Sequence, residues 1–463
     1  MTLSLRSFSR RIAPALAVLT SAVTVAVATP ASAVTPTDWT AYLGGPAHTS
    51  ASSDPGITPA IAASLSRKWQ FNIGFVSSPV VADGSVFIGS FAGWFYKINA
   101  LTGAPQKKIF LGFQPKRTCA AFGFASTVTV ARDPSSGLDT VYVAAPDGYL
   151  YALDAATLTR KWRSAIAIPS TKVSDYFQWS SPTVVNGRIY VGISSNCDKP
   201  LVRGGVAAYQ QTTGKKVASF YTVPKGAVGG SVWSSVAVDS AGDVYATTGN
   251  GPGTSTRYDT DSILKLSPAL KLLARFQVPK AQITGDGDFG GSPTLFTTRI
   301  KGAVAQLVGA CNKNGLYYAL RRSSMKVVWT RRIGVSSIGK VRAQCQSAAA
   351  FDGRYLYMAG PATTINGEAY RGSVQRIAPA TGAIGWKTGL PEGVLTSPAV
   401  NGSGVIGVGT YDNGTAPNVT YLVDASTGAI LMTLDQGVDF PQSAFADGWL
   451  YTAGGTGLYA WGP

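Results

Sequence analysis

The chain has 463 residues, of which 45% are hydrophobic and only 14% are charged, a composition that suits one large folded unit rather than several domains. Its 40 Lys and Arg residues outnumber 23 Asp and Glu residues, giving a formal net charge of +17 at pH 7. The basic residues are spread along the chain in short runs, so the charge does not indicate nucleic-acid binding. No stretch after residue 33 is long and apolar enough to span a bilayer.

Residues 1–33 have the pattern of a cleaved export signal. Arg6, Arg10 and Arg11 precede a long apolar stretch, and the small residues Ala31-Ser32-Ala33 form a cleavage site. The general secretory route and the twin-arginine route both remain open, and the first is favoured because the residues after the arginine pair are weakly apolar. We therefore expect a secreted, extracellular protein.

Removal of this signal leaves 37 basic and 23 acidic residues, a net charge of +14. Outside a cell, such a charge favours contact with an anionic cell-wall polymer or an anionic ligand. The same charge can also serve solubility alone. Both interpretations stay open at this stage.

The rest of the chain repeats one phrase eight times. A copy opens with Ser and Pro or a small residue, continues as short alternating strands, and closes with Asp, Thr and Trp, as in residues 141–162. The copies open near residues 78, 126, 180, 234, 292, 347, 397 and 443. A repeat of about fifty residues predicts an all-β fold, an eight-bladed β-propeller of four-stranded antiparallel blades. A seven-bladed ring follows instead if the copy at Ser126 or Ser443 is degenerate.

The two ends of the repeat region predict how the ring closes. The last copy, residues 443–463, leaves no room for a full outer strand. Residues 67–71 have the pattern of that missing strand, so we expect an N-terminal strand to complete the last blade and remove the exposed edges. The predicted organisation is a signal peptide at 1–33, an N-terminal segment at 34–66 and a propeller at 67–463.

Four cysteines, Cys119, Cys197, Cys311 and Cys345, lie beyond the signal, and none forms a Cys-x-x-Cys pair. In an oxidising compartment this pattern indicates two disulfide bonds. A zinc site is not expected, because His48 is the only histidine. Three pairings are possible, and we expect Cys119–Cys197 and Cys311–Cys345 because each bond joins loops of neighbouring blades.

Strand direction gathers the unusual polar residues at one face of the predicted ring. The first two strands of a blade are antiparallel, so the residues before the first strand and after the second lie at the same end. Blades two to six thereby bring acids, amides, a lysine, two tryptophans and the four cysteines to one face. The side chains of chemical interest among them are Trp179, Asp198, Trp233, Asn250, Asp286, Asp288 and Lys313.

These residue types together favour oxidation of an alcohol by a quinone. Carboxylate and amide oxygens suit a hard cation such as calcium. The flat face of a Trp can stack on a planar ring, and a lysine can stabilise an anionic quinone oxygen. A carboxylate that does not bind the metal can act as a general base.

In these segments the chain resembles the pyrroloquinoline quinone (PQQ) repeat propellers, which include the PQQ-dependent alcohol and polyvinyl alcohol dehydrogenases. The segments that carry the resemblance are Gly229-Gly230-Ser231-Val232-Trp233, Thr248-Gly249-Asn250-Gly251, Asp286-Gly287-Asp288 and Asn312-Lys313-Asn314-Gly315. The resemblance implies that PQQ stacks on Trp233 and that Asn250, with Asp198, binds calcium. It also implies that Lys313 stabilises the reduced cofactor and that Asp288 takes the alcohol proton, with Asp286 as the second choice of base.

The sequence departs from the family in two places. It has no pair of adjacent cysteines, since two alanines follow Cys119, and it has no Cys-x-x-Cys-His haem motif, which implies a separate electron acceptor. We expect a PQQ- and calcium-dependent dehydrogenase that acts on an alcohol or a hydroxylated polymer. The alternative is a non-catalytic extracellular propeller that serves as a scaffold and binds cell-wall polymer or envelope proteins.

Overall fold

The computed structural model describes residues 37–75, 77–114, 122–167, 175–253, 257–283, 285–335, 344–411, 417–437 and 440–463. All of them belong to the compact unit Ala33–Pro463. The predicted signal at 1–33 lies outside the described residues. Within those residues, no helix is long and apolar enough to cross a membrane.

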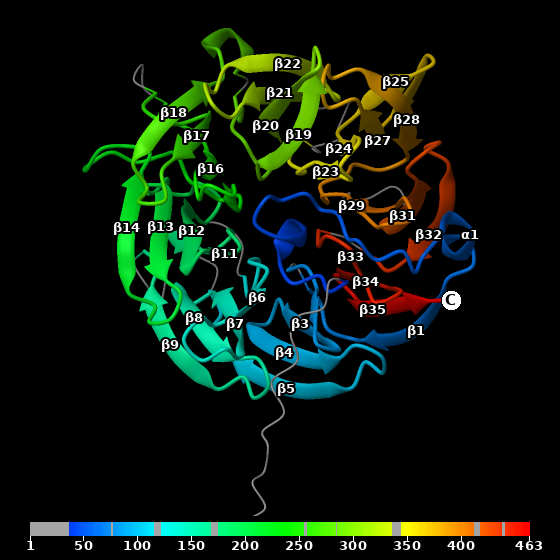
Figure 1. The fold of residues 1–463 in the computed structure, drawn as a ribbon, viewed down its shortest axis with the longest axis horizontal. Coiled ribbons are helices and arrows are strands. Elements are labelled where there is room, and N and C mark those ends of the chain that lie inside the picture. Colours follow the sequence, from blue (N-terminus) through cyan, green and yellow to red (C-terminus); the bar gives the residue numbers. More distant parts are fainter. Residues whose placement is uncertain are drawn as a thin grey trace, which may run out of the picture. The chain divides into compact units, whose positions relative to one another are not determined.

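The described strands form eight antiparallel blades of four strands, which follow one another around a ring (Figure 1). Blades one to four are β2 (Val80–Ala82), β3 (Ser85–Gly89), β4 (Trp94–Asn99) and β5 (Pro105–Phe110); β6 (Thr129–Arg132), β7 (Asp139–Ala144), β8 (Tyr149–Asp154) and β9 (Arg160–Ala165); β11 (Thr183–Val185), β12 (Arg188–Ser195), β13 (Gly205–Gln210) and β14 (Lys216–Tyr221), with β10 (Tyr176–Phe177) also paired to β12; and β15 (Ala237–Val238), β16 (Val244–Thr247), β17 (Ser262–Leu266) and β18 (Leu272–Gln277).

Blades five to eight are β19 (Thr294–Ile300), β20 (Ala303–Cys311), β21 (Leu316–Arg321) and β22 (Val327–Arg332); β23 (Ala350–Phe351), β24 (Leu356–Gly360), β27 (Gly372–Ile377) and β28 (Ile384–Leu390), with the hairpin β25 (Thr363–Ile365) and β26 (Glu368–Tyr370); β29 (Ala399–Val400), β30 (Val405–Gly409), β31 (Val419–Asp424) and β32 (Ile430–Asp435); and β33 (Ala444–Ala446), β34 (Trp449–Gly454), β35 (Gly457–Gly462) and β1 (Ser66–Phe71). The short helices are α1 (Pro59–Ala62), η1 (Tyr42–Gly44) and η2 (Lys280–Gln282).

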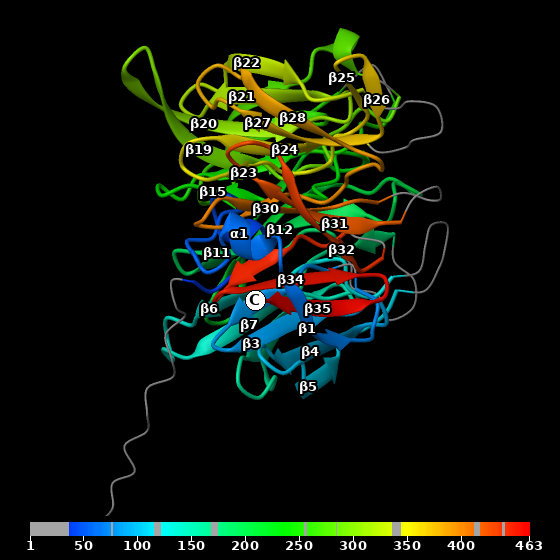
Figure 2. The same cartoon turned by 90° about the vertical axis from the view of Figure 1, so that its right-hand side faces the viewer.

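The ring closes as the sequence predicts. Strand β1 pairs antiparallel with β35, with Trp69 opposite Ala460, so an N-terminal strand forms the outer edge of the last blade. Figure 2 shows this junction from the side of the ring, with β35 and α1 facing the viewer. The eight-bladed prediction is confirmed and the seven-bladed alternative is wrong, because the copies at Ser126 and Ser443 both open complete blades.

The hydrophobic core lies between the faces of neighbouring blades. Val80 and Phe87 of blade one, for example, share one buried cluster with Val141 and Leu153 of blade two. The inner strands are therefore buried almost throughout, whereas the outer strands, such as β5, are mostly exposed. This packing explains why a single repeat cannot fold alone.

Two contact patterns explain the repeated phrase. At six blade openings a hydroxyl accepts a hydrogen bond of 2.8 to 2.9 Å from the backbone N–H of the preceding opening, in the pairs Ser78–Thr127, Thr127–Ser181, Ser181–Ser235, Ser235–Ser292, Ala348–Ser397 and Gln442–Ser78. On the outer strands, each repeated Trp packs on the glycine of a turn in the next blade, in the pairs Trp69–Gly103, Trp162–Gly214, Trp329–Gly382 and Trp386–Gly428. Adjacent blades are thus linked at both their inner and outer edges.

The N-terminal segment forms a hub at the inner edges of the blades. Carbonyls of Trp39, Thr40, Pro46, Ala47, Thr49 and Ser50 accept hydrogen bonds from the first strands of six blades, β2, β6, β15, β19, β23 and β29. Figure 1 shows the first part of the segment in dark blue inside the ring, whereas α1 lies at the outer side beside β32. His48 is buried in this first part, with Nδ1 3.1 Å from the carbonyl oxygen of Pro293. The segment therefore completes the inner edge of the propeller.

Candidate active site

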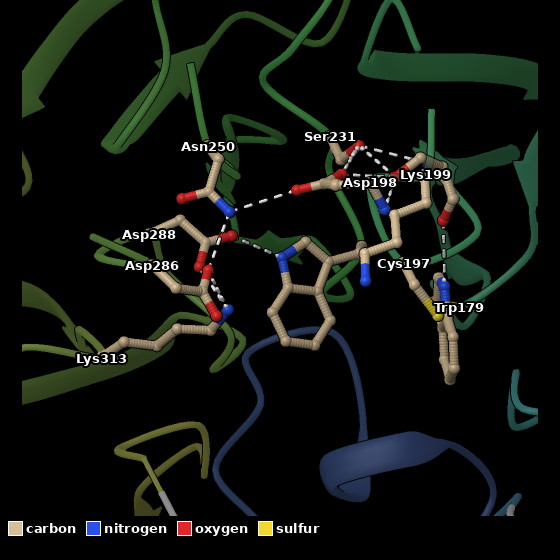
Figure 3. A pocket seen from close by; sticks show the side chains of 11 residues that line it. Trp179, Cys197, Asp198, Lys199, Ser231, Asn250, Asp286, Asp288 and Lys313 are labelled. Carbon is tan, nitrogen blue, oxygen red and sulfur yellow. Dashed lines mark hydrogen bonds and ion pairs between the residues drawn. The ribbon is translucent and has the colours of Figure 1, made fainter. Parts of the chain in front are cut away.

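A cavity of about 450 Å³ lies where loops of blades three, four and five meet (Figure 3). Its lining residues are Trp179, Ser195, Cys197, Asp198, Lys199, Ser231, Trp233, Asn250, Asp286, Asp288 and Lys313. Most of them precede the first strand of a blade or follow its second strand, which is the relationship that strand direction predicted. The structure thus brings together in one cavity all seven side chains that the sequence singled out.

Two glycines set the position of Trp233. Gly229 and Gly230 have positive φ angles of 115° and 64°, which favour glycine over residues with a Cβ. A Cβ on Gly230 would lie 2.1 Å from Oγ1 of Thr222, so a larger residue does not fit. The N–H of Gly230 donates to the carbonyl of Asn250 at 2.8 Å. The Gly-Gly turn therefore fastens the segment that carries Trp233 to the turn that carries Asn250.

Trp233, Asp288 and Lys313 form a triad in which the acid and the lysine are buried and the tryptophan is half-buried. The indole Nε1 of Trp233 donates to Oδ2 of Asp288 at 3.0 Å. Nζ of Lys313 lies 2.6 Å from Oδ1 of Asp288 and 5.1 Å from the centroid of the Trp233 ring. The backbone N–H of Lys313 also donates to the carbonyl of Asp288 at 3.1 Å. These contacts hold the tryptophan ring and the lysine in a fixed mutual position.

Burial and charge shift the pKa values of this triad. Burial raises the pKa of Asp288 to about 6, although Lys313 and the bond from Trp233 oppose the shift. Burial alone would lower the pKa of Lys313, but Asp288 and Asp286 outweigh it and raise that pKa above its usual value. Lys313 is therefore a cation at neutral pH.

Asn250 lies between two acids, beside the triad (Figure 3). Its Nδ2 lies 2.8 Å from Oδ1 of Asp286 and 3.2 Å from Oδ2 of Asp198. Burial would raise the pKa of Asp286, but Lys313 and the bonds from Asn250 and Gln344 hold it below its usual value. Asp286 is therefore ionised at neutral pH, and its Oδ1 is also 2.9 Å from Nζ of Lys313.

The oxygen-bearing side chains around Asn250 fit a hard cation. The orientation of an amide is assigned from its hydrogen-bond partners, and rotation of this amide would turn Oδ1 of Asn250 toward the carboxylates of Asp198 and Asp286. Two carboxylates and one amide oxygen are ligands that calcium accepts. Among the residues that the structure describes, no group of three or more His, Cys, Asp and Glu side chains has metal-binding geometry, so the amide is needed to complete the set.

Two serines that the sequence analysis did not select hold Asp198 in place. Ser195 exchanges hydrogen bonds with Asp198: its Oγ donates to Oδ1, and it accepts from the backbone N–H of Asp198 at 2.9 Å. Oγ of Ser231 lies 3.4 Å from the same Oδ1. The sequence signal for Ser195 is the Ser-x-x-Asp spacing, which is typical of a local turn in which a hydroxyl meets a backbone N–H.

The cysteines are described in part. Cys311 and Cys345 form a disulfide bond with a Cα–Cα distance of 5.6 Å, which is the pairing expected from the sequence and joins blade five to the loop before blade six. Cys197 lines the cavity and is disulfide-bonded. Cys119 lies outside the described residues, so the Cys119–Cys197 pairing stays a prediction.

Comparison with known families assigns the chain. A family model for PQQ, described as "Glucose/ethanol/alcohol dehydrogenase, beta-propeller domain", matches residues 39–332, which is more than half of the chain. The chain belongs to this family. The matched range contains all the cavity residues, so the site lies within the part of the chain that the family model covers.

Individual relatives agree with the family assignment. The chain is 28% identical over 314 residues to the quinohemoprotein alcohol dehydrogenase ADH IIB of Pseudomonas putida, covering 58% of this chain and 44% of that protein. It thus spans less than half the length of this relative. Among solved structures, the quinohemoprotein alcohol dehydrogenase from Comamonas testosteroni superposes with a TM-score of 0.72 at 18% identity, covering 92% of this chain and 80% of that chain. A europium-containing methanol dehydrogenase also gives a TM-score of 0.72, at 17% identity and with coverages of 93% and 98%. Both structural matches show the fold alone.

Proposed function

We propose that this chain binds PQQ and a hard cation in the cavity and oxidises alcohol hydroxyl groups, with electrons passing to a separate acceptor. The main support is that Trp233, Asn250, Asp286 and Lys313, which come from four segments matching the family's motifs, line one cavity. Family membership supports the reaction class. When bound, PQQ would supply the two-electron acceptor for the alcohol, and the cation would polarise a quinone carbonyl.

Each side chain has a role that follows from its contacts. The face of Trp233 offers a flat apolar surface for the planar cofactor, and Lys313 provides a fixed positive charge beside it. Asn250 and Asp198 supply oxygen atoms for calcium, the expected ion, which leaves the carboxylate of Asp286 for proton transfer. The europium in the related methanol dehydrogenase structure makes a trivalent ion a useful probe of the same position.

The geometry favours Asp286 over Asp288 as the general base. Asp288 is the first choice of base from the sequence, but its side chain is only 1% exposed and its two oxygens contact Trp233 and Lys313. The side chain of Asp286 is 56% exposed, so a substrate hydroxyl can reach it. Asp286 would accept the hydroxyl proton on a carboxylate oxygen, and Asp288 would position the tryptophan and the lysine.

The reaction is tested by dye reduction. The chain without residues 1–33 is reconstituted with PQQ and calcium and supplied with 1-propanol, 2-propanol or polyvinyl alcohol, which separates free alcohols from a hydroxylated polymer as substrates. We expect alcohol-dependent dye reduction that is lost in Trp233→Ala and Asp286→Asn. The matched variants Trp94→Ala and Asp154→Asn change the same residue types away from the cavity and should keep the rate. Absence of turnover with every alcohol would refute the dehydrogenase proposal.

The second candidate is a non-catalytic scaffold that binds cell-wall polymer or envelope proteins. It is favoured by the small number of acidic ligands, since the acids that contact the Asn250 amide in the described part of the chain are Asp198 and Asp286. Export is proposed from the sequence pattern, and recovery of a chain beginning at Val34 from the culture medium would test it. A chain retained with residues 1–33 attached would contradict export.

A further inference from the structure

The basic surplus of the chain is concentrated on the outer strands. These eight strands carry twelve Lys and Arg residues and a single acid, Asp435 of β32. The basic residues are Arg67, Lys68, Lys107, Lys108, Arg160, Lys161, Arg163, Lys216, Arg275, Arg331, Arg332 and Lys387. The net charge of +14 after removal of the signal is therefore mostly located at the rim of the ring.

Eight of the twelve lie on four consecutive blades. Strands β1, β5, β9 and β14 are the outer strands of blades eight, one, two and three, and they follow one another along the rim (Figure 1). Together they contain no acid. We call this surface the basic arc, and its residues, all exposed, are Arg67, Lys68, Lys107, Lys108, Arg160, Lys161, Arg163 and Lys216.

The charge of the basic arc is not neutralised within the chain. In the part of the chain that the structure describes, none of its eight side chains forms an ion pair. In contrast, Arg275 on β18, outside the arc, pairs with Asp259. Like charges side by side on a sheet surface disfavour folding, so the arc brings no evident benefit to the fold.

The hydrogen-bond partners of two arc cations are neutral: Nζ of Lys161 donates to Oγ1 of Thr140 at 2.7 Å and Nζ of Lys216 donates to the carbonyl of Ile166 at 2.8 Å. Lys108 lies over the ring of Trp94 at 4.8 Å and Arg163 over that of Tyr149 at 4.6 Å, so aromatic rings orient them without removing their charge. Asp154 lies in the turn before β9, and its Oδ1 accepts hydrogen bonds from that turn. One of these bonds comes from the N–H of Thr157 at 2.9 Å. Asp154 therefore caps its own turn, and it interacts with Lys161 through its charge without forming an ion pair.

We propose that the basic arc binds a linear polyanion, such as a phosphate-bearing polymer of the cell envelope. The cations extend over four blades, so a compact anion reaches only a fraction of them, whereas an extended chain can follow the rim. The total charge read from the sequence could not separate this function from solubility, but the location of the charge favours a docking surface. The proposal is independent of PQQ and of the alcohol reaction.

The experiment measures binding of long-chain polyphosphate to the chain without residues 1–33 in 50, 150 and 500 mM salt. The arc variant carries Lys107→Glu, Lys108→Glu, Arg160→Glu and Lys161→Glu. The control variant makes the same change of net charge at exposed positions off the arc: Lys225→Glu, Lys271→Glu, Lys301→Glu and Arg354→Glu. Circular dichroism and the melting temperature establish that both variants are folded.

In low salt we expect the arc variant to bind polyphosphate about 100-fold more weakly than the unmodified chain, and the control variant less than about fivefold more weakly. The affinity of the unmodified chain should fall steeply as the salt concentration rises. Triphosphate, a short anion, should bind at least about tenfold more weakly than the polymer, because it meets few cations. Equal losses in the two variants would overturn the proposal, since net charge alone would then govern binding. If triphosphate bound as tightly as the polymer, the proposal of an extended site would be overturned. If a folded acidic protein alone displaced polyphosphate, the surface would be assigned to a protein partner instead.

Discussion

The indole Nε1 of Trp233 donates a hydrogen bond to Oδ2 of Asp288 across 3.0 Å. The other oxygen of this carboxylate lies 2.6 Å from Nζ of Lys313. One buried acid thus orients both the flat surface and the cation of the cavity. Asp286, two residues earlier, is half-exposed and faces the amide of Asn250. The two acids should therefore respond differently to the same substitution.

Asp288→Asn should destabilise the fold, because it removes the closest anionic partner of a buried lysine. We expect a loss of about 2 to 4 kcal/mol in the free energy of unfolding, measured with urea. Asp286→Asn should cost less than about 1 kcal/mol but should lower the dye-reduction rate at least about 100-fold, because the base is lost. A stable Asp288→Asn variant that lacks activity would instead identify Asp288 as the base.

Cation binding should depend on Asn250 and Asp198 even without PQQ. Binding to the folded state raises its stability by mass action, so calcium or europium should raise the melting temperature of the unmodified chain. Asn250→Ala or Asp198→Ala should weaken this binding at least about tenfold, because each removes one of few oxygen ligands. Asp154→Ala, in a distant turn, serves as the control. The same cation effect in all variants would place the ion elsewhere.

The hub makes stability depend on pH through His48. Burial lowers the pKa of His48 to about 4, with the bond to the Pro293 carbonyl opposing the shift only in part. In the unfolded chain a histidine has a pKa of about 6.5. The stability that the neutral, buried His48 contributes to the fold is therefore fully present above pH 6.5, and it falls by about 3 kcal/mol in all as the pH drops toward 4. The difference in unfolding free energy between the unmodified chain and His48→Asn should therefore shrink between pH 7 and pH 4.5. A constant difference would contradict this role.

The disulfide bond between Cys311 and Cys345 should contribute to stability by restricting the unfolded chain. It joins residues 34 apart in the sequence, and removal of such a bond costs about 2 to 5 kcal/mol. The double variant Cys311→Ser with Cys345→Ser is compared with the unmodified chain in urea, and Ser324→Ala provides an exposed control. Coincident unfolding curves for the double variant and the unmodified chain would show that the bond is dispensable.

Strand direction was sufficient to predict which residues meet at the site. It placed Trp233, Asn250 and Lys313 at one face, because the start of a blade's first strand and the end of its second lie together. It could not separate Asp286 from Asp288. They are two residues apart in a loop, and only the packing of Trp233 and Lys313 buries one and leaves the other half-exposed.

Other features needed the three-dimensional arrangement. The N-terminal segment contacts six blades through backbone carbonyls, and backbone bonds leave no residue pattern in the sequence. Ser195 and Ser231 were not selected because serine is common in turns. Ser195 bonds to Asp198 within one turn, whereas the approach of Ser231 to Asp198 depends on a loop 33 residues further along the chain. The basic arc became visible only once the outer strands were assigned, since its residues are spread from Arg67 to Lys216.

The proposed quinone site is best tested by calorimetric titration of PQQ into the purified chain, with and without calcium. We expect calcium-dependent binding in the micromolar range or tighter, lost in Trp233→Ala and kept in Trp94→Ala. Absence of binding heat under both conditions, or binding that is the same with and without calcium and in Trp233→Ala, would contradict a quinone site in this cavity.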